Sequence, residues 1–600
     1  MSKVRNWLVG IGAIVVVLGG AGGAYWYFKI FRAPSTQARL LGAADLVPDQ
    51  ALMATFVSTD EAQWSALDRL GSPAAQNLLK ERVAALQTEV LQGSNLSYAE
   101  DLAPWVDGVM VSVLPPTEVK AQTRADQATE QNGKPNGQQS NPQQPNPQQP
   151  NSQEQNPQET SSQTSSQMGE TNLLMVMGIK DKLRALEFAQ KMRSHPNVTL
   201  ETLDYQGVEV SKLTQGGEDA YSAVLGDYVV FSPQQRSVEW AIETSKGSPS
   251  LRDQPGAQSA LQSALNLENP VMQLYIPDYA GLVNQILAEN EGAAPLSPSI
   301  REQLAVLDNV VAGVSLEDTG LRLRALVKLE DKPTIFSYRT APGQVLSFLP
   351  GDTLGLISGQ DPQSLWQNLV VESQNNPDLG VVVEGLKRQL TQLQLDLEQD
   401  VLSWMTGEFV VAALPNPPGQ GILGSLGVAG AIVLDSGDPE RTNQTLGKLD
   451  ALVEGNLTVE KTETEGKAVT YWRLPQGIFN NQTFLGYGWL TPNTLFVALG
   501  DPAIESLLKP TAPLLNDTPE FQSLTSTLPQ TNGGYFYFKV ADVATSTSLA
   551  PIGSQFQRLP QETQTLVQTI DSVGITTSQP SDNLNQVDVF LQFAPPQSPQ

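Results

Sequence analysis

Two stretches of this sequence decide its fold: DLAPWVDGVMVSVLPP, which begins at Asp101, and DVLSWMTGEFVVAALPNP, which begins at Asp400. Asp, Trp and Gly keep the same spacing in both stretches, and each glycine leads into an apolar run that ends at Leu-Pro. Such runs of valine and other apolar residues are typical of strands with a buried face. The sequence therefore carries one structural motif twice.

Other segments recur in the same order on either side of this motif. The matched pairs are VPD at 47–49 with LPGD at 349–352, LLMVMGIKD at 173–181 with GAIVLDSGD at 430–438, LETLDYQGVEVSKL at 200–213 with VEKTETEGKAVTYWRL at 459–474, LRDQPGAQSAL at 251–261 with LNDTPEFQSL at 515–524, and LDNVVAGVSL at 307–316 with TIDSVGITTS at 569–578. The alternating runs around Gly207 and Gly466 predict hairpins. We therefore expect an α+β fold, in which two tandem copies of one mixed helix and antiparallel-sheet domain occupy residues 40–340 and 341–595.

Helical spacing of apolar residues marks two longer segments, PAAQNLLKERVAALQTEVLQ at 73–92 and GVVVEGLKRQLTQLQLDLEQDVLSWM at 380–405. Residues that recur every three or four positions line one face of a helix. We expect both stripes to face the core.

Residues 117–170 interrupt the first copy with a segment rich in Pro, Gln and Asn. The segment has almost no apolar side chain to bury, which predicts a disordered insertion. The second copy has only a short Pro- and Gly-rich loop at the same place. We therefore interpret the insertion as a surface spacer.

The N-terminus predicts a single transmembrane helix at residues 7–28, because no charged residue lies between Arg5 and Lys29. At about 1.5 Å per residue, this segment is long enough for a hydrocarbon core of about 30 Å. Aromatic residues stand near both of its ends, where they suit the membrane interfaces. A cleavable signal peptide is the alternative, with small residues up to Ala24 before the cut. The short N-terminal tail resembles an uncleaved signal sequence, so we expect the domains on the exported side.

Composition excludes several classes of function. The formal net charge is −27, from 63 acidic and 36 basic residues, and nucleic acid binding needs a basic footprint. There is no cysteine, which removes disulfides, thiolate nucleophiles and zinc–thiolate sites. The single histidine, His195, precedes a proline, and this pattern is typical of a turn rather than of a catalytic site.

Two catalytic motifs occur in the wrong context. The GxGxxG from Gly419 to Gly424 leads into a strand, whereas a dinucleotide site requires a helix after the glycines. Ser506 and Lys509 form an SxxK that resembles that of penicillin-binding proteins, and an SDN follows at 581–583. The KTG element is missing after it, and the first copy has neither motif.

The recurrent acids Asp101 and Asp400 are the best carboxylates for a shared site, but each precedes a tryptophan at a helix boundary. A structural cap is the simpler interpretation of both. The sequence therefore predicts no catalytic, cofactor-binding or metal-binding residue.

The anchor, the repeated DxxxWxxG motif and the Pro- and Gln-rich insertion together resemble a family of cyanobacterial membrane-anchored proteins that is defined only by a domain of unknown function. This resemblance implies a plasma membrane or thylakoid location, with the domains in the periplasm or the thylakoid lumen. It supplies no catalytic residues to transfer. We expect a non-enzymatic exported binding or assembly factor that contacts the membrane through its anchor and a protein partner of unknown identity. The alternatives are a hydrolase with a carboxylate or Ser–Lys site in one copy, and a carrier of apolar ligands.

Overall fold

The structure is a computed structural model that describes residues 36–73, 76–77, 98–116, 172–193, 198–215, 217–268, 270–289, 296, 301, 304–329, 339–374, 377–392, 395–421, 423–476, 481–510, 513–545, 558 and 561–594. The expected transmembrane helix at 7–28 and the expected insertion at 117–170 lie outside these residues. Within the described ranges, no helix is both long enough and apolar enough to cross a membrane.

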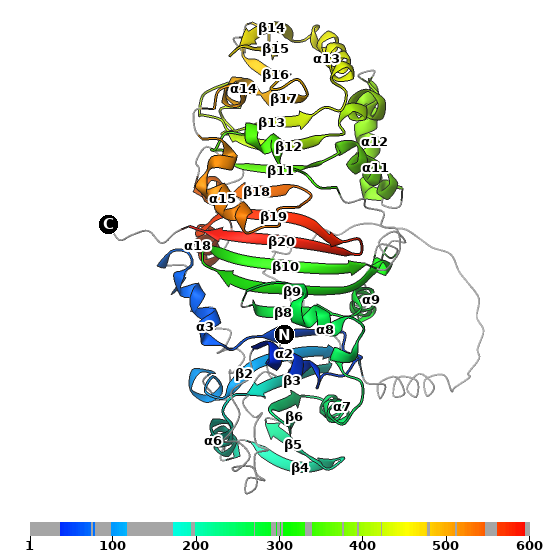
Figure 1. Ribbon diagram of the computed structural model, residues 1–600, viewed down its shortest axis with the longest axis vertical. Coiled ribbons are helices and arrows are strands. Elements are labelled where there is room, and N and C mark those ends of the chain that lie inside the picture. Colours follow the sequence, from blue (N-terminus) through cyan, green and yellow to red (C-terminus); the bar gives the residue numbers. More distant parts are fainter. Residues whose placement is uncertain are drawn as a thin grey trace, which may run out of the picture.

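The strands form one antiparallel sheet, in which 20 strands lie side by side along the longest axis of the molecule (Figure 1). The strands before residue 330 are β1 (Met53–Val57), β2 (Val106–Leu114), β3 (Asn172–Ile179), β4 (Thr199–Tyr205), β5 (Val208–Gln215), β6 (Glu218–Leu225), β7 (Tyr228–Ser232), β8 (Pro270–Ile276), β9 (Leu307–Glu317) and β10 (Gly320–Leu329). The strands after residue 338 are β11 (Gly355–Gln360), β12 (Glu408–Pro415), β13 (Val428–Asp435), β14 (Thr458–Thr464), β15 (Lys467–Arg473), β16 (Thr483–Trp489), β17 (Thr494–Leu499), β18 (Tyr535–Lys539), β19 (Ile570–Ser581) and β20 (Leu584–Phe593). We call these two sets of strands, with the helices between them, the first half and the second half.

Neighbouring strands pair in the order β4-β5-β6-β7-β3-β2-β1-β8-β9-β10-β20-β19-β18-β11-β12-β13-β17-β16-β15-β14. Read inwards from either edge, the two halves have the same strand order: each strand of the second half carries the number of its counterpart in the first half plus ten. The halves meet where β10 pairs with β20.

The repeated order extends to single residues. In the first half, Ala54 of β1 pairs with Tyr275 of β8, and in the second half Leu356 of β11 pairs with Tyr537 of β18. Both tyrosines are buried, with 1% of their surface exposed. Positions can therefore be matched between the halves by their place in the sheet.

Helices cover both faces of the sheet. The α-helices are α2 (Thr36–Ala44), α3 (Glu61–Trp64), α6 (Lys182–Arg193), α7 (Gln235–Ser245), α8 (Ala257–Ser259), α9 (Tyr279–Glu289), α11 (Pro362–Ser373), α12 (Pro377–Gln392), α13 (Pro439–Val453), α14 (Gly500–Leu508), α15 (Pro519–Ser526), α16 (Val540–Thr545) and α18 (Gln561–Val567). Shorter turns are η3 (Ser65–Arg69), η4 (Tyr98–Leu102), η5 (Leu251–Asp253), η6 (Ala260–Ala264), η7 (Gln344–Phe348), η8 (Leu397–Val401), η9 (Leu402–Trp404) and η10 (Leu515–Asp517). Mixed helices with an antiparallel sheet confirm the expected α+β class.

Alternation along each strand sends apolar side chains to both faces, so each half has a core on either side of the sheet. On β3, Leu174 and Val176 belong to the cluster that contains Ile242 of α7, whereas Met177 belongs to the cluster that contains Phe188 of α6. The second half is arranged in the same way, with α14 in one cluster and α13 in the other. Two layers of helices therefore hold the sheet between them.

Two hairpins have the turn that the sequence predicts. Gln206 and Gly207 join β4 to β5 with φ of 52° and 78°, and Glu465 and Gly466 join β14 to β15 with φ of 52° and 73°. Two consecutive residues at positive φ match the twist of the flanking strands, and glycine adopts this conformation without strain.

The helix expected over 380–405 is shorter than its pattern indicates. Helix α12 ends at Gln392, and the side chain of Asp396 accepts a hydrogen bond from the backbone N–H of Gln399, which starts the separate turn η8. A carboxylate in this position is an N-cap, so it begins a new helical segment rather than continuing the old one. The stripe is also only partly a core face, because Val383 is buried but Val381 is 70% exposed.

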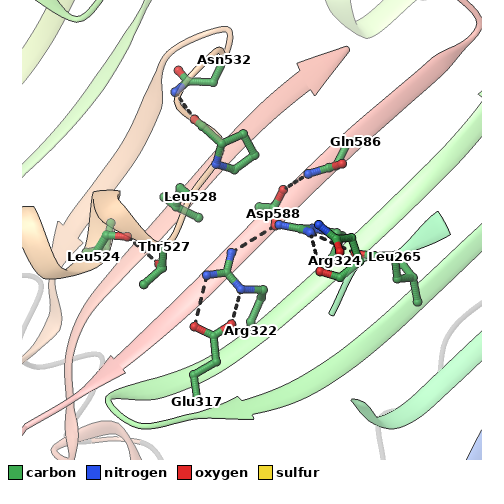
Figure 2. Close-up of polar contacts among 12 residues, drawn as sticks. Leu265, Glu317, Arg322, Arg324, Leu524, Thr527, Leu528, Asn532, Gln586 and Asp588 are labelled. Atoms are coloured by element: carbon green, nitrogen blue, oxygen red, sulfur yellow. Dashed lines mark hydrogen bonds and ion pairs between the residues drawn. The ribbon is translucent and has the colours of Figure 1, made fainter. Parts of the chain in front are cut away.

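A buried ionic cluster joins the two halves at the centre of the sheet (Figure 2). Arg324 of β10 lies directly opposite Asp588 of β20, and each is the fifth residue of its strand. Arg324 Nε donates to Asp588 Oδ1 at 2.8 Å, and Arg322 Nη1 donates to the same oxygen at 3.3 Å. Gln586 Nε2 donates to Asp588 Oδ2 at 2.5 Å. Glu317 pairs with Arg322, so the four charged groups of the cluster sum to zero.

Asp588 is fully buried and Arg322 is 4% exposed. Burying charges is costly unless they are paired and hydrogen bonded, and here the carboxylate oxygens have charged or amide donors. Arg324 Nη1 also donates to the carbonyl of Leu265 at 2.9 Å, which ties β10 to the loop before β8. The cluster therefore fixes the register in which the halves join.

We predict that Asp588→Ala lowers the free energy of unfolding by about 3–5 kcal/mol, because it leaves the buried Arg322 and the mostly buried Arg324 without their shared carboxylate. Urea denaturation measures this change. Asp582→Ala is the control, since Asp582 lies exposed in the turn of the same hairpin and its loss should change stability by less than about 0.5 kcal/mol. Equal effects of the two substitutions would contradict a special role for the cluster.

Candidate functional site

The repeated Asp–Trp motif forms the same contact in both halves. Trp105 Nε1 donates to the carbonyl of Asp101 at 2.7 Å, and Trp404 Nε1 donates to the carbonyl of Asp400 at 2.8 Å. Both indoles are buried, at 0% and 3% exposure. A buried tryptophan needs a partner for its N–H, and the spacing of four residues supplies one. The motif is therefore a packing element.

The two aspartate carboxylates also have equivalent partners. Asp101 Oδ1 accepts from Lys191 Nζ of α6 at 2.6 Å, and Asp400 Oδ1 accepts from Lys448 Nζ of α13 at 2.7 Å. The hydrogen bond from Lys448 lowers the pKa of Asp400, and a backbone hydrogen bond from Asp396 lowers it further. Each acid therefore ties the turn before its tryptophan to a neighbouring helix through an ion pair, whereas the sequence interpretation is a helix cap.

The other motifs from the sequence do not assemble a catalytic site. Ser506 Oγ donates to the carbonyl of Pro502 within α14, while Lys509 pairs with Glu465. Residues 582–583 form the turn between β19 and β20. The glycine-rich loop at 419–424 connects β12 to the adjacent antiparallel strand β13, so no helix follows it to hold a phosphate.

His195 lies outside the described residues. Among the residues that are described, no group of three or more His, Asp or Glu side chains is placed to hold a metal ion. The candidate site is therefore a cavity and not one of these motifs.

A cleft of about 720 Å³ opens in the second half, where the end of β13 and the start of β17 meet the turn η7. Polar residues outnumber apolar ones among the described residues of its lining, which include one acid and neither Lys nor Arg: Pro342, Gly343, Gln344, Ser347, Phe348, Asp435, Ser436, Thr491, Asn493, Thr494 and Asn516. Asp435 Oδ1 accepts a hydrogen bond from Thr494 Oγ1 at 2.6 Å, which fixes its carboxylate between the two strands. We call this space the η7 cleft.

Glu408 of β12 fixes the turn that forms one wall of the η7 cleft. Its buried carboxylate accepts backbone N–H groups from Gly343, from Gln344 at 2.8 Å and from Val345 at 3.2 Å. The first N–H groups of a helical turn have no partner inside the turn, so a carboxylate is a favourable acceptor there. Burial nevertheless raises the pKa of Glu408, and the negative charge of Asp435 adds to this effect.

The matching place in the first half is closed by an arginine side chain. Ile179 is the counterpart of Ser436, because the backbone N–H groups of both donate to the turn before the paired strand: to the carbonyl of Asp227 at 2.9 Å and to that of Asn493 at 2.8 Å. Arg39 of α2, 3% exposed, reaches this place and donates from Nη2 to the carbonyl of Ile179 at 2.9 Å.

Two more contacts hold this arginine. Arg39 Nε donates to Asp107 Oδ2 at 2.8 Å, and its guanidinium lies 5.9 Å from the ring centre of Tyr228. Tyr228 pairs with Gly178 on β3 as Thr494 pairs with Asp435 on β13. The arginine and the tyrosine therefore fill the space that remains open in the second half.

A second ion pair closes the first half further out. Arg252 Nη1 pairs with Asp45 Oδ2 at 3.0 Å. Arg252 follows Leu251, whose N–H donates to the carbonyl of Val47, and Asn516 follows Leu515, whose N–H donates to the carbonyl of Leu349. Asp45 lies two residues before Val47, and Ser347 lies two residues before Leu349. Asp45 and Ser347 therefore occupy matched positions in the two halves. Two short polar residues thus stand in the second half where the first has a charged pair.

Sequence reasoning missed the η7 cleft, although part of the signal was available. The matched segments LRDQP and LNDTP already show Arg252 replaced by Asn516, and counting back from the match of VPD with LPGD aligns Ala341 with Arg39. Replacing large residues with small ones at matched positions creates a cavity only if the large side chains pack against one another in the fold. Their meeting point depends on the sheet, not on the local pattern.

The fold and the site together define an α+β protein built on one long antiparallel sheet with a polar cleft in one half. The chain belongs to the family described as "Protein of unknown function (DUF3352)", which matches residues 9–593. This membership confirms the expectation of a family defined only by a domain of unknown function.

No curated protein matches the chain. Solved structures that resemble it include crystal form III of TP0453, with 5% identity over 48% of this chain and 81% of that one and a TM-score of 0.25. Crystal form I of TP0453 has 6% identity over 49% and 80% of the two chains and a TM-score of 0.24. Similarity at this level supports no inference about fold or function.

We predict that the stability of the protein falls relative to a Glu408→Gln variant as the pH rises from about 4 to 7. A carboxyl whose pKa is raised above its usual value of 4.5 binds its proton more tightly in the folded state, so its contribution is present at low pH and is lost as the pH passes through the folded pKa. Urea unfolding of both proteins across this range measures the difference. Glu463→Gln, on exposed β14, is the control and should show no such trend. A difference that stays constant with pH, or grows in favour of the wild type, would contradict the raised pKa.

Proposed function

We propose that this protein is a tandem duplication whose second copy has kept an open ligand site and whose first copy has lost it. The mirrored strand order and the matched backbone contacts of Ile179 and Ser436 support a duplication with copies at 40–340 and 341–595. Copies that share a backbone can diverge in side chains while the fold stays the same. The observation that carries the proposal is the η7 cleft, open in one half and filled by Arg39 in the other.

The function that suits this arrangement is binding rather than catalysis. The cleft brings together one carboxylate, hydroxyls and amides. Thr494 donates to the Asp435 carboxylate, but the described lining supplies no histidine or lysine beside a hydroxyl and no set of metal ligands. We therefore propose a non-enzymatic binding or assembly factor with its ligand site in the second half. The hydrolase alternative loses its Ser–Lys pair, because Ser506 and Lys509 are engaged with different partners.

A carrier of apolar ligands is the second candidate, and one surface feature favours it. An apolar row crosses one face of the central sheet at successively paired positions: Ile432, Val411, Ile357, Phe536, Ile575, Val589 and Leu323. Ile357 is 55% exposed and Val411 is 46% exposed. Exposed apolar rows of this kind mark surfaces that meet another apolar surface.

Site-specific photo-cross-linking in living cells separates these proposals. We expect a photoreactive amino acid in place of Asn516, inside the η7 cleft, to give a discrete cross-linked product that Ala341→Arg abolishes. The matched control is the same amino acid in place of Arg252, in the closed first half, which should give none. A third position, Ile357, tests the apolar row.

The outcomes separate clearly. No product at Asn516, or equal products at Asn516 and Arg252, would contradict a ligand site in the cleft. A lipid adduct at Ile357 without any product at Asn516 would favour the carrier instead.

The membrane anchor is part of the proposal, with the domains in the periplasm or thylakoid lumen of a cyanobacterium. The uncharged stretch at 7–28 supports it. We predict that the full chain stays in the membrane pellet after carbonate extraction and that a chain lacking residues 1–32 does not. Release of the full chain would contradict the anchor. Proteolysis of the domains in right-side-out thylakoid vesicles, together with protection in intact spheroplasts, would contradict export.

A further inference from the structure

We propose that the η7 cleft binds a guanidinium group, presented as an arginine side chain by a partner protein. This inference rests on the proposed function, since it names the chemistry of the ligand for the same cleft. Its basis is a comparison inside the molecule: the first half holds its own guanidinium at the matching place.

Arg39 shows how this fold recognises a guanidinium. Its planar group receives three kinds of contact: a carboxylate from Asp107, the strand-end carbonyl of Ile179, and the face of the Tyr228 ring. These are the contacts that a guanidinium forms most favourably, because it combines a fork of donors with a flat surface that stacks on aromatic rings.

The η7 cleft offers the same three kinds of group from different residues. Asp435 supplies the carboxylate, on β13 rather than at the start of the preceding strand. Ser436, the counterpart of Ile179, lies in the lining at the end of the strand, and Phe348 adds an aromatic residue to it. Thr494 occupies only one side of the Asp435 carboxylate through its bond to Oδ1, and a carboxylate can accept several donors.

Charge selects a cation for this place. Asp435 lies in the lining, the buried Glu408 carboxylate lies behind η7, and none of the described lining residues is basic. An anionic ligand such as a phosphate would therefore meet repulsion with no compensating cation. A metal ion would need more acid or imidazole ligands than the described residues bring together here.

The missing side chain also leaves the required space. By sequence count Ala341 aligns with Arg39, although Arg39 lies in α2 and Ala341 lies in the segment before η7. Asn516 and Ser347 align with the closing ion pair of the first half. The volume of about 720 Å³ is larger than one arginine side chain needs, so residues next to the arginine would also enter. A peptide segment suits this space better than a free amino acid.

The test uses the purified full chain in detergent micelles and three fluorescent peptides that differ at one position: Gly-Arg-Gly, Gly-Lys-Gly and Gly-citrulline-Gly, each blocked at both ends. Citrulline has the shape of arginine without its charge, so it isolates the charged fork. We expect the arginine peptide to bind at least about tenfold more tightly than the citrulline peptide, measured by fluorescence anisotropy. The lysine peptide should bind with intermediate affinity, because an ammonium keeps the charge but not the fork.

Three variants locate the binding. Asp435→Asn should weaken the arginine peptide at least about tenfold, and Asn516→Arg, which introduces a cation at the rim, should do the same. Asp517→Asn removes an exposed acid beside the cleft that is not part of its lining, and it should change affinity less than about twofold. Thermal unfolding of each variant shows whether it is folded before binding is compared.

Equal binding of the three peptides, or equal effects of Asp435→Asn and Asp517→Asn, would overturn the assignment of a guanidinium. If the cross-link at Asn516 forms but the peptides are not distinguished, the cleft binds something else and the proposed function stands. If both fail, the proposed function fails as well. Free arginine that competes as strongly as the arginine peptide would replace the partner protein with a small guanidino compound.

Discussion

The pairing of β10 with β20 is the constraint on which the rest of this structure depends. These strands belong to different halves, and their contact turns two separate sheets into one. Arg324 and Asp588 face each other at its centre, where a one-residue slip would place a buried guanidinium against an apolar side chain. A charged pair in the interior contributes little net stability compared with apolar packing, but it strongly disfavours every register that separates the charges. The cluster therefore acts mainly by excluding alternatives.

A sheet of this length has two exposed edges, and both are protected. The outermost strands, β4 and β14, read TLETLDY and TVEKTET, and most of their side chains are exposed. Charged residues on an edge disfavour pairing with another chain, because the charges would have to be desolvated. The charges on both outermost strands therefore disfavour extension of the sheet by a second chain.

The two halves share one strand order but differ in the side chains at the ends of β3 and β13. Trp105 and Trp404 keep the same buried contact because the helix turn and the strand after it depend on that contact. Among the described residues, no such indole contact is shared by the two halves in the space near the ends of β3 and β13. One half fills it with an arginine, and the other leaves it open beside Asp435. The fold can tolerate this difference because the core clusters on the two faces of the sheet hold the surrounding strands in place.

The local elements of this protein follow from its residue patterns. The α+β class, the strands after Gly108 and Gly407 and the hairpins at Gly207 and Gly466 all follow from residue patterns within a dozen positions, because alternation and turn chemistry are local properties. The same patterns overestimated the helix after Gly380, since they did not weigh Asp396 as the cap of a new segment.

The way the halves join and the position of the cleft depend instead on the packing of the whole chain. Nothing in the alternation of β10 or β20 names a partner strand, and Arg324 and Asp588 are far apart in the sequence although they touch in the fold. The η7 cleft likewise forms where the end of β13 and the start of β17 meet the turn η7. In the first half, Arg39 of α2 fills the corresponding space. A cavity is the space that packing leaves unfilled, so it becomes defined only when all of the surrounding elements have been placed.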